Sequence, residues 1–170
     1  MTRRTQPKDS APATPTVEQA REYLLNSLNY APRTRQQLDD LLAKRNVPPE
    51  MAAALLDRFE EVGLINDSEF AEAWVRDRHW SRGLSRRALA RELALKGISQ
   101  PDIEAALEQV DADDEREAAR KLAERKVRVL SRFDSAAQEQ KLMGMLMRRG
   151  HTPALAGEVA REVVARTLVE

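Results

Sequence analysis

A helix-ending phrase occurs three times in this chain at nearly equal spacing, and it limits the possible folds more than any other feature. Lys96-Gly97-Ile98 closes one amphipathic stretch, Arg45-Asn46-Val47 lies 51 residues before it, and Arg149-Gly150-His151 lies 53 residues after it. A cation is favoured at the carbonyl end of a helix, and Gly or Asn tolerates the left-handed conformation that ends one. The chain is therefore predicted to consist of repeated helical units.

The apolar residues around these phrases keep the same spacing. At a constant offset of 51 residues, six positions of the first unit match six of the second: Ala20, Tyr23, Leu24, Leu38, Leu42 and Leu56 correspond to Ala71, Trp74, Val75, Leu89, Leu93 and Leu107. The third copy is looser, because an insertion at about 127–134 separates Ala119 and Leu122 from Leu142 and Leu146. We predict three tandem three-helix repeats at 16–65, 66–112 and 113–170.

Composition supports an all-α fold. Aromatic residues make up only 4% of the chain, and Ala, Leu, Arg and Glu are abundant. Because units in such arrays contact only their neighbours, an elongated body is expected. Residues 1–15 are polar and contain three prolines, so they are predicted to be a disordered tail. No stretch approaches the roughly 18 apolar residues of a membrane span, and a cytoplasmic location is expected.

Capping signals place the helix starts. Thr14-Pro15 is predicted to open the first helix, which runs to about Leu28, and Thr34 with Gln37 forms a capping box for the second. The other starts are predicted at Pro48-Pro49, at Asn66 with Glu69, at Ser85 and at Ser99, followed by helices at 113–130, 135–149 and 153–169.

The apolar stripes of these helices predict the core. Trp74 and Leu93 are expected at the centre of the middle repeat, because their equivalents Tyr23 and Leu42 are also apolar. The predicted core residues of the second and third repeats are Trp74, Leu89, Leu93, Ile98, Leu107, Leu142 and Leu146.

The sequence offers little catalytic chemistry. It contains no cysteine, and His79 and His151, its two histidines, lie in different repeats. No second imidazole stands at metal-ligand spacing, and no glycine-rich phosphate loop is present. His151 replaces an apolar repeat position, which favours a structural role. We therefore expect no enzyme, no cofactor and no metal.

Charge is segregated although the formal net charge is zero. Across residues 76–96, seven cations stand against Asp77 and Glu92, and they are Arg76, Arg78, Arg82, Arg86, Arg87, Arg91 and Lys96. A second run contains Arg120, Lys121, Arg125, Lys126, Arg128 and Arg132, with Glu124 as its only acid. Such runs are usually solvated helix surface. Two of them in corresponding repeats, rich in arginine, favour a partner with carboxylates or phosphates.

The middle repeat resembles a known family. The segment 64–75 (LINDSEFAEAWV), followed by Arg78, Gly83, Glu92-Leu93 and Lys96-Gly97-Ile98, resembles the core signature of the RecX family, regulators of the RecA recombinase. Lys141-Leu142 and the segment 146–150 resemble the end of that family's third repeat. The resemblance covers about residues 17–165. It departs at Asn46, where Gly is used in the other repeats, and at His151, where Tyr is more usual.

The resemblance implies a fold and a mechanism. Family members are curved, elongated bodies of three-helix repeats that bind in the groove of the RecA–single-stranded-DNA filament. They inhibit ATP hydrolysis, strand exchange and filament growth, and so modulate recombination and DNA repair. For this chain we expect a monomer that binds the RecA filament, with weak binding to single- or double-stranded DNA. The predicted partner-binding residues are Arg76, Arg82, Arg86, Arg87, Arg91, Lys96, Arg125, Lys126, Arg148 and Arg149.

Two alternatives remain. Three-helix units with a tight turn also occur in helix-turn-helix regulators, which read bases with the final helix. Here the final helices of the first two repeats are acidic, with Asp57, Glu60 and Glu104 among others, and phosphates would repel them. The second alternative is a helical scaffold for an unrelated protein.

Overall fold

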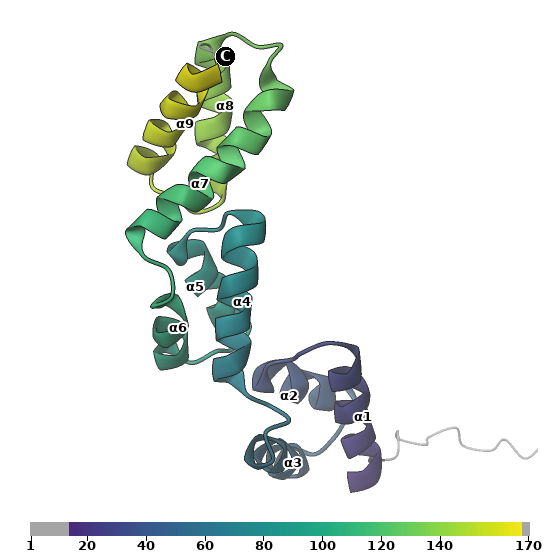
Figure 1. Cartoon of the computed structure of the whole chain (residues 1–170). Coiled ribbons are helices and arrows are strands. Elements are labelled where there is room, and N and C mark those ends of the chain that lie inside the picture. Colours follow the sequence, from purple (N-terminus) through teal and green to yellow (C-terminus); the bar gives the residue numbers. More distant parts are fainter. Residues whose placement is uncertain (1–13, 168–170) are drawn as a thin grey trace, which may run out of the picture. The chain divides into compact units, whose positions relative to one another are not determined.

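The computed structural model describes residues 14–167. Within them the chain forms nine α-helices, one short 3₁₀ turn and no strand (Figure 1). The helices are α1 Val17–Tyr30, α2 Arg35–Lys44, α3 Pro49–Glu61, α4 Asp67–Arg82, α5 Arg86–Leu95, α6 Gln100–Leu107, α7 Ala112–Val127, α8 Ser135–Arg148 and α9 Pro153–Thr167, with the 3₁₀ turn η1 at Arg128–Leu130. The prediction of an all-α chain with three-helix units in tandem is confirmed.

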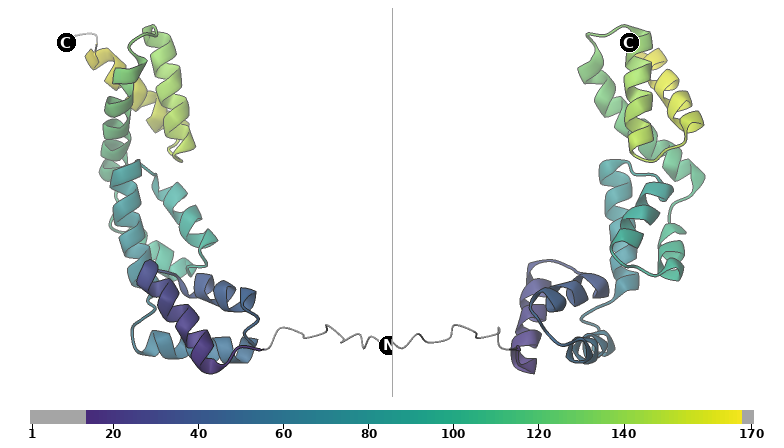
Figure 2. Two further views of the ribbon diagram at one scale, coloured as in Figure 1. Left: turned by 90° about the vertical axis from the view of Figure 1, so that its right-hand side faces the viewer. Right: turned by 180° about the vertical axis from the view of Figure 1, so that it is seen from behind.

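The chain divides into two compact units. One contains α1–α3, which we call repeat 1, and ends at Ile65. The other begins at Asn66 and contains repeat 2 (α4–α6) and repeat 3 (α7–α9). Figure 2 shows the helices of each repeat from two further sides. Of the predicted tail, only Thr14 and Pro15 belong to the described residues.

The first helix begins two residues later than predicted. Thr16, not Thr14, is the N-cap of α1, and it forms a capping box with Gln19. The Thr16 hydroxyl accepts from the Gln19 backbone N–H at 3.2 Å, and the Gln19 side chain accepts from the Thr16 N–H at 2.9 Å. Thr14 has Val17 at the corresponding position, which cannot return this bond. The reciprocal bond therefore sets the start of the helix.

The remaining starts lie close to the predicted ones. Thr34 forms the predicted capping box with Gln37, and Pro49 occupies the first position of α3. The side chains of Ser85 and Ser99 cap α5 and α6 as predicted. α7 starts slightly early, at Ala112, because Asp111 forms a capping box with Asp114.

The three helix-ending phrases have the predicted geometry. Asn46, Gly97 and Gly150 all have positive φ, at 58°, 79° and 92°. The residue after each of them is buried: Val47 in repeat 1, Ile98 in repeat 2 and His151 in repeat 3. In each repeat, the residue with positive φ therefore ends one helix, and the side chain of the next residue packs into the core. The repeat register predicted from the sequence is confirmed.

Each repeat has its own apolar core. Leu38 and Leu42 are fully buried in repeat 1, as are their equivalents Leu89 and Leu93 in repeat 2 and Leu142 and Leu146 in repeat 3. Ile98 and Leu107 are also buried.

Trp74 departs from this pattern, because it lies at the edge of the core rather than at its centre. Its indole N–H donates to Glu92 at 2.8 Å, and the cations of Arg78 and Lys96 each lie 4.1 Å from a ring centroid of this indole. The polar N–H and the cations hold the ring at the edge.

Candidate functional site

Repeats 2 and 3 join through the turn that follows α4. The Ser85 backbone N–H donates to the Arg149 carbonyl at 3.0 Å. Gly150 approaches this turn so closely that a Cβ on it would clash with the Ser85 hydroxyl oxygen. Gly150 also has positive φ, so a larger residue there would meet both backbone strain and a clash. This junction sets the relative placement of the cations on repeats 2 and 3.

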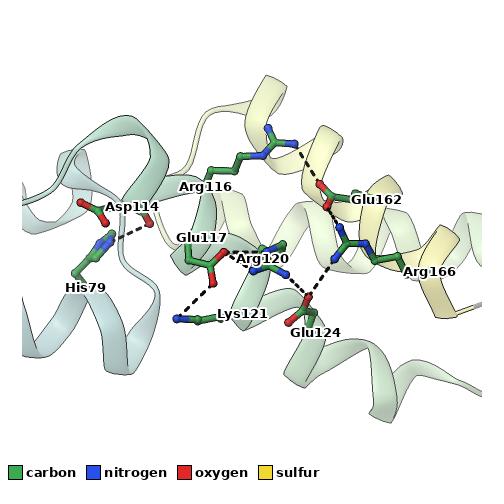
Figure 3. Close-up of polar contacts among 9 residues, drawn as sticks. All are labelled: His79, Asp114, Arg116, Glu117, Arg120, Lys121, Glu124, Glu162 and Arg166. Carbon is green, nitrogen blue, oxygen red and sulfur yellow. Dashed lines mark hydrogen bonds and ion pairs between the residues drawn. The ribbon is translucent and has the colours of Figure 1, made fainter.

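Two buried histidines also cross the junction, one from each repeat. His79 of α4 has Nε2 3.2 Å from the Asp114 carbonyl oxygen of repeat 3 (Figure 3), and Nδ1 2.9 Å from the Leu84 carbonyl oxygen. His151 has Nε2 2.8 Å from the Gly83 carbonyl oxygen of repeat 2. Burial lowers the pKa of His151, while its bond to the Gly83 carbonyl acts in the opposite direction. Both histidines make contacts across the junction, and for His151 this agrees with the structural role predicted from the sequence.

Arg86, one of the predicted partner-binding residues, makes internal contacts. Its guanidinium donates to the Leu107 carbonyl at 2.6 Å and also to the Val110 carbonyl. Leu107 is the last residue of α6 and Val110 lies in the connection to α7, so the cation satisfies one acceptor that the helix end leaves open and one in the connection. The Arg86 backbone N–H also donates to Glu115 of repeat 3 at 2.8 Å. The Arg86 side chain therefore stabilises repeat 2, and its backbone N–H joins repeat 2 to repeat 3.

An ionic network between α7 and α9 engages Arg120 and Lys121 of the second basic run (Figure 3). Arg120 pairs with Glu117 and Glu124, and Lys121 pairs with Glu117 at 3.4 Å. From α9, Glu158 and Glu162 pair with Arg116 at 2.9 and 3.1 Å, and Arg166 pairs with Glu162 at 2.7 Å. The hydrogen bond from Arg120 lowers the pKa of Glu117. The network contains Arg116, Arg120, Lys121 and Arg166 against Glu117, Glu124, Glu158 and Glu162, so its charges balance.

The other predicted residues fall into two groups. Lys96 and Arg149 are half-buried, Lys96 over Trp74 and Arg149 at the repeat junction. The rest are exposed, and no carboxylate of the described residues pairs with them. These are Arg76, Arg82, Arg87, Arg91, Arg125, Lys126 and Arg148. Arg87 and Arg91 lie one turn apart on the exposed side of α5, while Leu89 and Leu93 point into the core.

Trp80 is a surface feature that sequence reasoning did not single out. The apolar stripe of α4 contains Ala71 and Val75 and continues to His79, so Trp80 falls beside the stripe. Trp80 is 44% exposed, and the Lys121 ammonium lies 5.0 Å from its ring centroid. A large apolar residue one position off the stripe is the sequence signal that could have identified it.

The described residues contain no group of three or more His, Asp or Glu side chains arranged to hold a metal ion. None of the helices between residues 14 and 167 combines the length and apolar character needed to cross a membrane.

Comparison with known proteins gives the family. Models described as the first, second and third three-helix domains of RecX match residues 20–59, 66–107 and 113–160. The Regulatory protein RecX of Streptomyces lividans is 49% identical over 148 residues, which span 87% of this chain and 79% of that protein. That of Thermobifida fusca is 42% identical over 164 residues, spanning 96% and 89%.

A solved structure agrees on the fold. The crystal structure of RecX from Lactobacillus salivarius superposes with a TM-score of 0.73 at 22% identity, covering 86% of this chain and 96% of that one. At this identity the likeness concerns the fold alone. The three matched domains and the close relatives show that the chain belongs to the RecX family of regulatory proteins.

Proposed function

We propose that this chain binds in the groove of the RecA–single-stranded-DNA filament and inhibits RecA ATP hydrolysis, strand exchange and filament growth. In this way it modulates homologous recombination and DNA repair. The observation that carries the proposal is the match of all three repeats to the three RecX domains. A regulator of this kind acts by binding, so it requires no catalytic residues of its own.

The exposed arginines of repeat 2 support a contact with an anionic partner. Arg87 and Arg91 form no ion pair among the described residues, so binding a carboxylate or phosphate breaks no existing pair. The planar guanidinium group can bind either anion through two parallel hydrogen bonds. Arg76 and Arg82 on α4 add to the positive charge of this repeat, and Arg125, Lys126 and Arg148 do so in repeat 3.

The helix-turn-helix alternative finds less support. In repeat 1 the final helix α3 presents Asp57 and Glu60, which pair with Arg35 at 2.7 and 2.5 Å. In repeat 2 the final helix α6 carries Asp102 and Glu104. Helices with these charges are poorly suited to lie in a DNA groove lined by phosphates.

An ATPase assay tests the proposal. RecA is assembled on single-stranded DNA, and ATP hydrolysis is followed as the purified protein is added. We expect the rate to fall. Inhibition well below one copy per RecA protomer indicates capping of filament ends, whereas inhibition only near saturation indicates coating of the groove. An unchanged rate with folded protein in excess over RecA contradicts the proposal and favours the scaffold alternative.

A further inference from the structure

Trp80 offers part of its ring to solvent beside a cationic helix. The His79 ring packs against it edge-on, with centroids 4.8 Å apart and planes at 75°. The Lys121 ammonium of α7 lies 5.0 Å from its centroid. Even so, Trp80 is 44% exposed. Trp74, the only other tryptophan, is bonded to Glu92 and covered by Arg78. The two tryptophans therefore differ in how available their rings are.

The cationic surface continues from Trp80 along α7. Lys121 lines a shallow hollow of about 260 Å³ together with Glu124, Arg125 and Arg128. Lys121, Arg125 and Arg128 are spaced four and three residues apart, so they share one helix face, and successive cations are separated by about one turn. We call Trp80, Lys121, Arg125 and Arg128 the Trp80 surface.

Positive charge dominates this surface although one acid lines the hollow. Glu124 is engaged by Arg120 at 3.0 Å and lies 3.8 Å from Arg166. Arg125 and Arg128 are exposed and pair with no carboxylate of the described residues. Two arginines are thus available to an anion next to an aromatic ring.

We propose that the Trp80 surface binds single-stranded nucleic acid, with one base stacked on Trp80 and the backbone phosphates against Arg125 and Arg128. Single-strand binding surfaces combine aromatic rings, on which bases stack, with cations that follow the phosphates. An acidic peptide would use the cations but not the ring. A base in a duplex is stacked on its neighbours and does not reach the ring. The contact requires no RecA, so it stands independently of the proposed function.

Tryptophan fluorescence provides a direct test. Trp74→Phe leaves Trp80 as the only tryptophan, and the variant is titrated with an oligothymidylate after its helix content has been verified by circular dichroism. We expect Trp80 fluorescence to be quenched as a thymine stacks on the ring, and the apparent affinity to fall as salt is raised.

Variants of the same surface are compared by anisotropy with a labelled oligothymidylate, in an otherwise wild-type chain. Arg125→Glu with Arg128→Glu is expected to weaken binding at least tenfold. Trp80→Ala is expected to weaken it about fivefold or more, near the lower end of the contribution of one stacked base. The matched control is Arg87→Glu with Arg91→Glu, which changes the charge equally on α5, and its loss is expected to be smaller.

Three results would overturn the proposal. The first is the absence of detectable oligothymidylate binding by wild type, or an affinity that is unchanged in both Trp80-surface variants while they remain folded. The second is equal binding of duplex and single strand with no effect of Trp80→Ala, which indicates charge attraction alone. The third is quenching of Trp80 by polyglutamate but not by oligothymidylate, which assigns the surface to an acidic peptide. If Trp74→Phe does not fold, the anisotropy comparison decides by itself.

Discussion

Leu93 in repeat 2 and Leu146 in repeat 3 occupy equivalent and fully buried positions, yet arginines of the two repeats have different surroundings. On α5 of repeat 2, Arg87 and Arg91 are exposed and unpaired among the described residues. On α7 of repeat 3, Arg116 and Arg120 are held by glutamates, some of them from α9. The same repeat architecture therefore carries arginines without ion pairs on α5 and arginines in a charge-balanced network between α7 and α9, and the difference lies in where carboxylates are placed, both along α7 and on α9.

The shared core gives the largest expected effect. Leu93→Ala and Leu146→Ala should each reduce the free energy of unfolding by about 2–5 kcal/mol, the usual range for truncation of a buried leucine. Urea unfolding measures both. A cost below about 0.5 kcal/mol for either variant, typical of a surface substitution, would mean that the two positions are not equivalent.

The exposed arginines of repeat 2 provide the next effect. Arg87→Glu with Arg91→Glu should preserve the fold and weaken binding to preformed RecA filaments at least tenfold, or about 1.4 kcal/mol, because the local charge is reversed. A matched control is Arg21→Glu with Lys44→Glu in repeat 1, where both residues are exposed. Equal losses in the two variants would show that only total charge matters. Wild-type binding should also weaken as salt is raised.

The ionic network of repeat 3 should contribute to folding stability, whereas the exposed arginines of repeat 2 should not. Arg120→Ala removes a partner from Glu117 and Glu124, and its destabilisation should be measurable at low salt and become smaller as salt is added. Arg91→Ala, which removes no ion pair among the described residues, should leave the urea midpoint unchanged at both salt concentrations. If both variants unfold alike, the structural contrast between the two repeats has no energetic counterpart.

The smallest effect concerns the pH dependence of the junction. Burial lowers the pKa of His151 in the folded chain below its ordinary value of 6.5, so the unfolded chain binds a proton more readily. The stability contributed by neutral His151 is therefore full above about pH 6.5 and decreases as pH falls from there toward the folded-state pKa. Urea unfolding of wild type and His151→Asn at several pH values measures this. The advantage of wild type should shrink on acidification, and an advantage that grows instead would mean the folded pKa is raised.

Local signals in the sequence were sufficient to predict most of the fold. The left-handed positions at Asn46, Gly97 and Gly150 follow from residue type, and Leu89 and Leu93 follow from helical periodicity. The start of α1 was misplaced although Thr16 and Gln19 carried the stronger signal. These features depend on residues only a few positions apart, so they can be predicted from a single sequence.

The paired and unpaired cations cannot be told apart in the same way, because some of the partners lie far along the chain. Arg86 donates to Leu107, which is 21 residues away, and Arg116 pairs with Glu162, which is 46 residues away. Neither partner belongs to the local charge pattern. The exposure of Trp80 beside Lys121 likewise depends on the packing of α4 against α7. Sequence runs of arginine identify candidate surfaces, and the fold decides which members are available.

Binding to the RecA filament is the central claim, and co-sedimentation measures it most directly. Wild-type protein is mixed with preformed RecA–single-stranded-DNA filaments and centrifuged, with RecA-free DNA as the control. We predict that the protein binds the filaments with much higher affinity than it binds RecA-free DNA, and that the affinity of the Arg87→Glu, Arg91→Glu variant for the filaments is at least tenfold lower. Folded wild-type protein that remains in the supernatant at every filament concentration would contradict the claim.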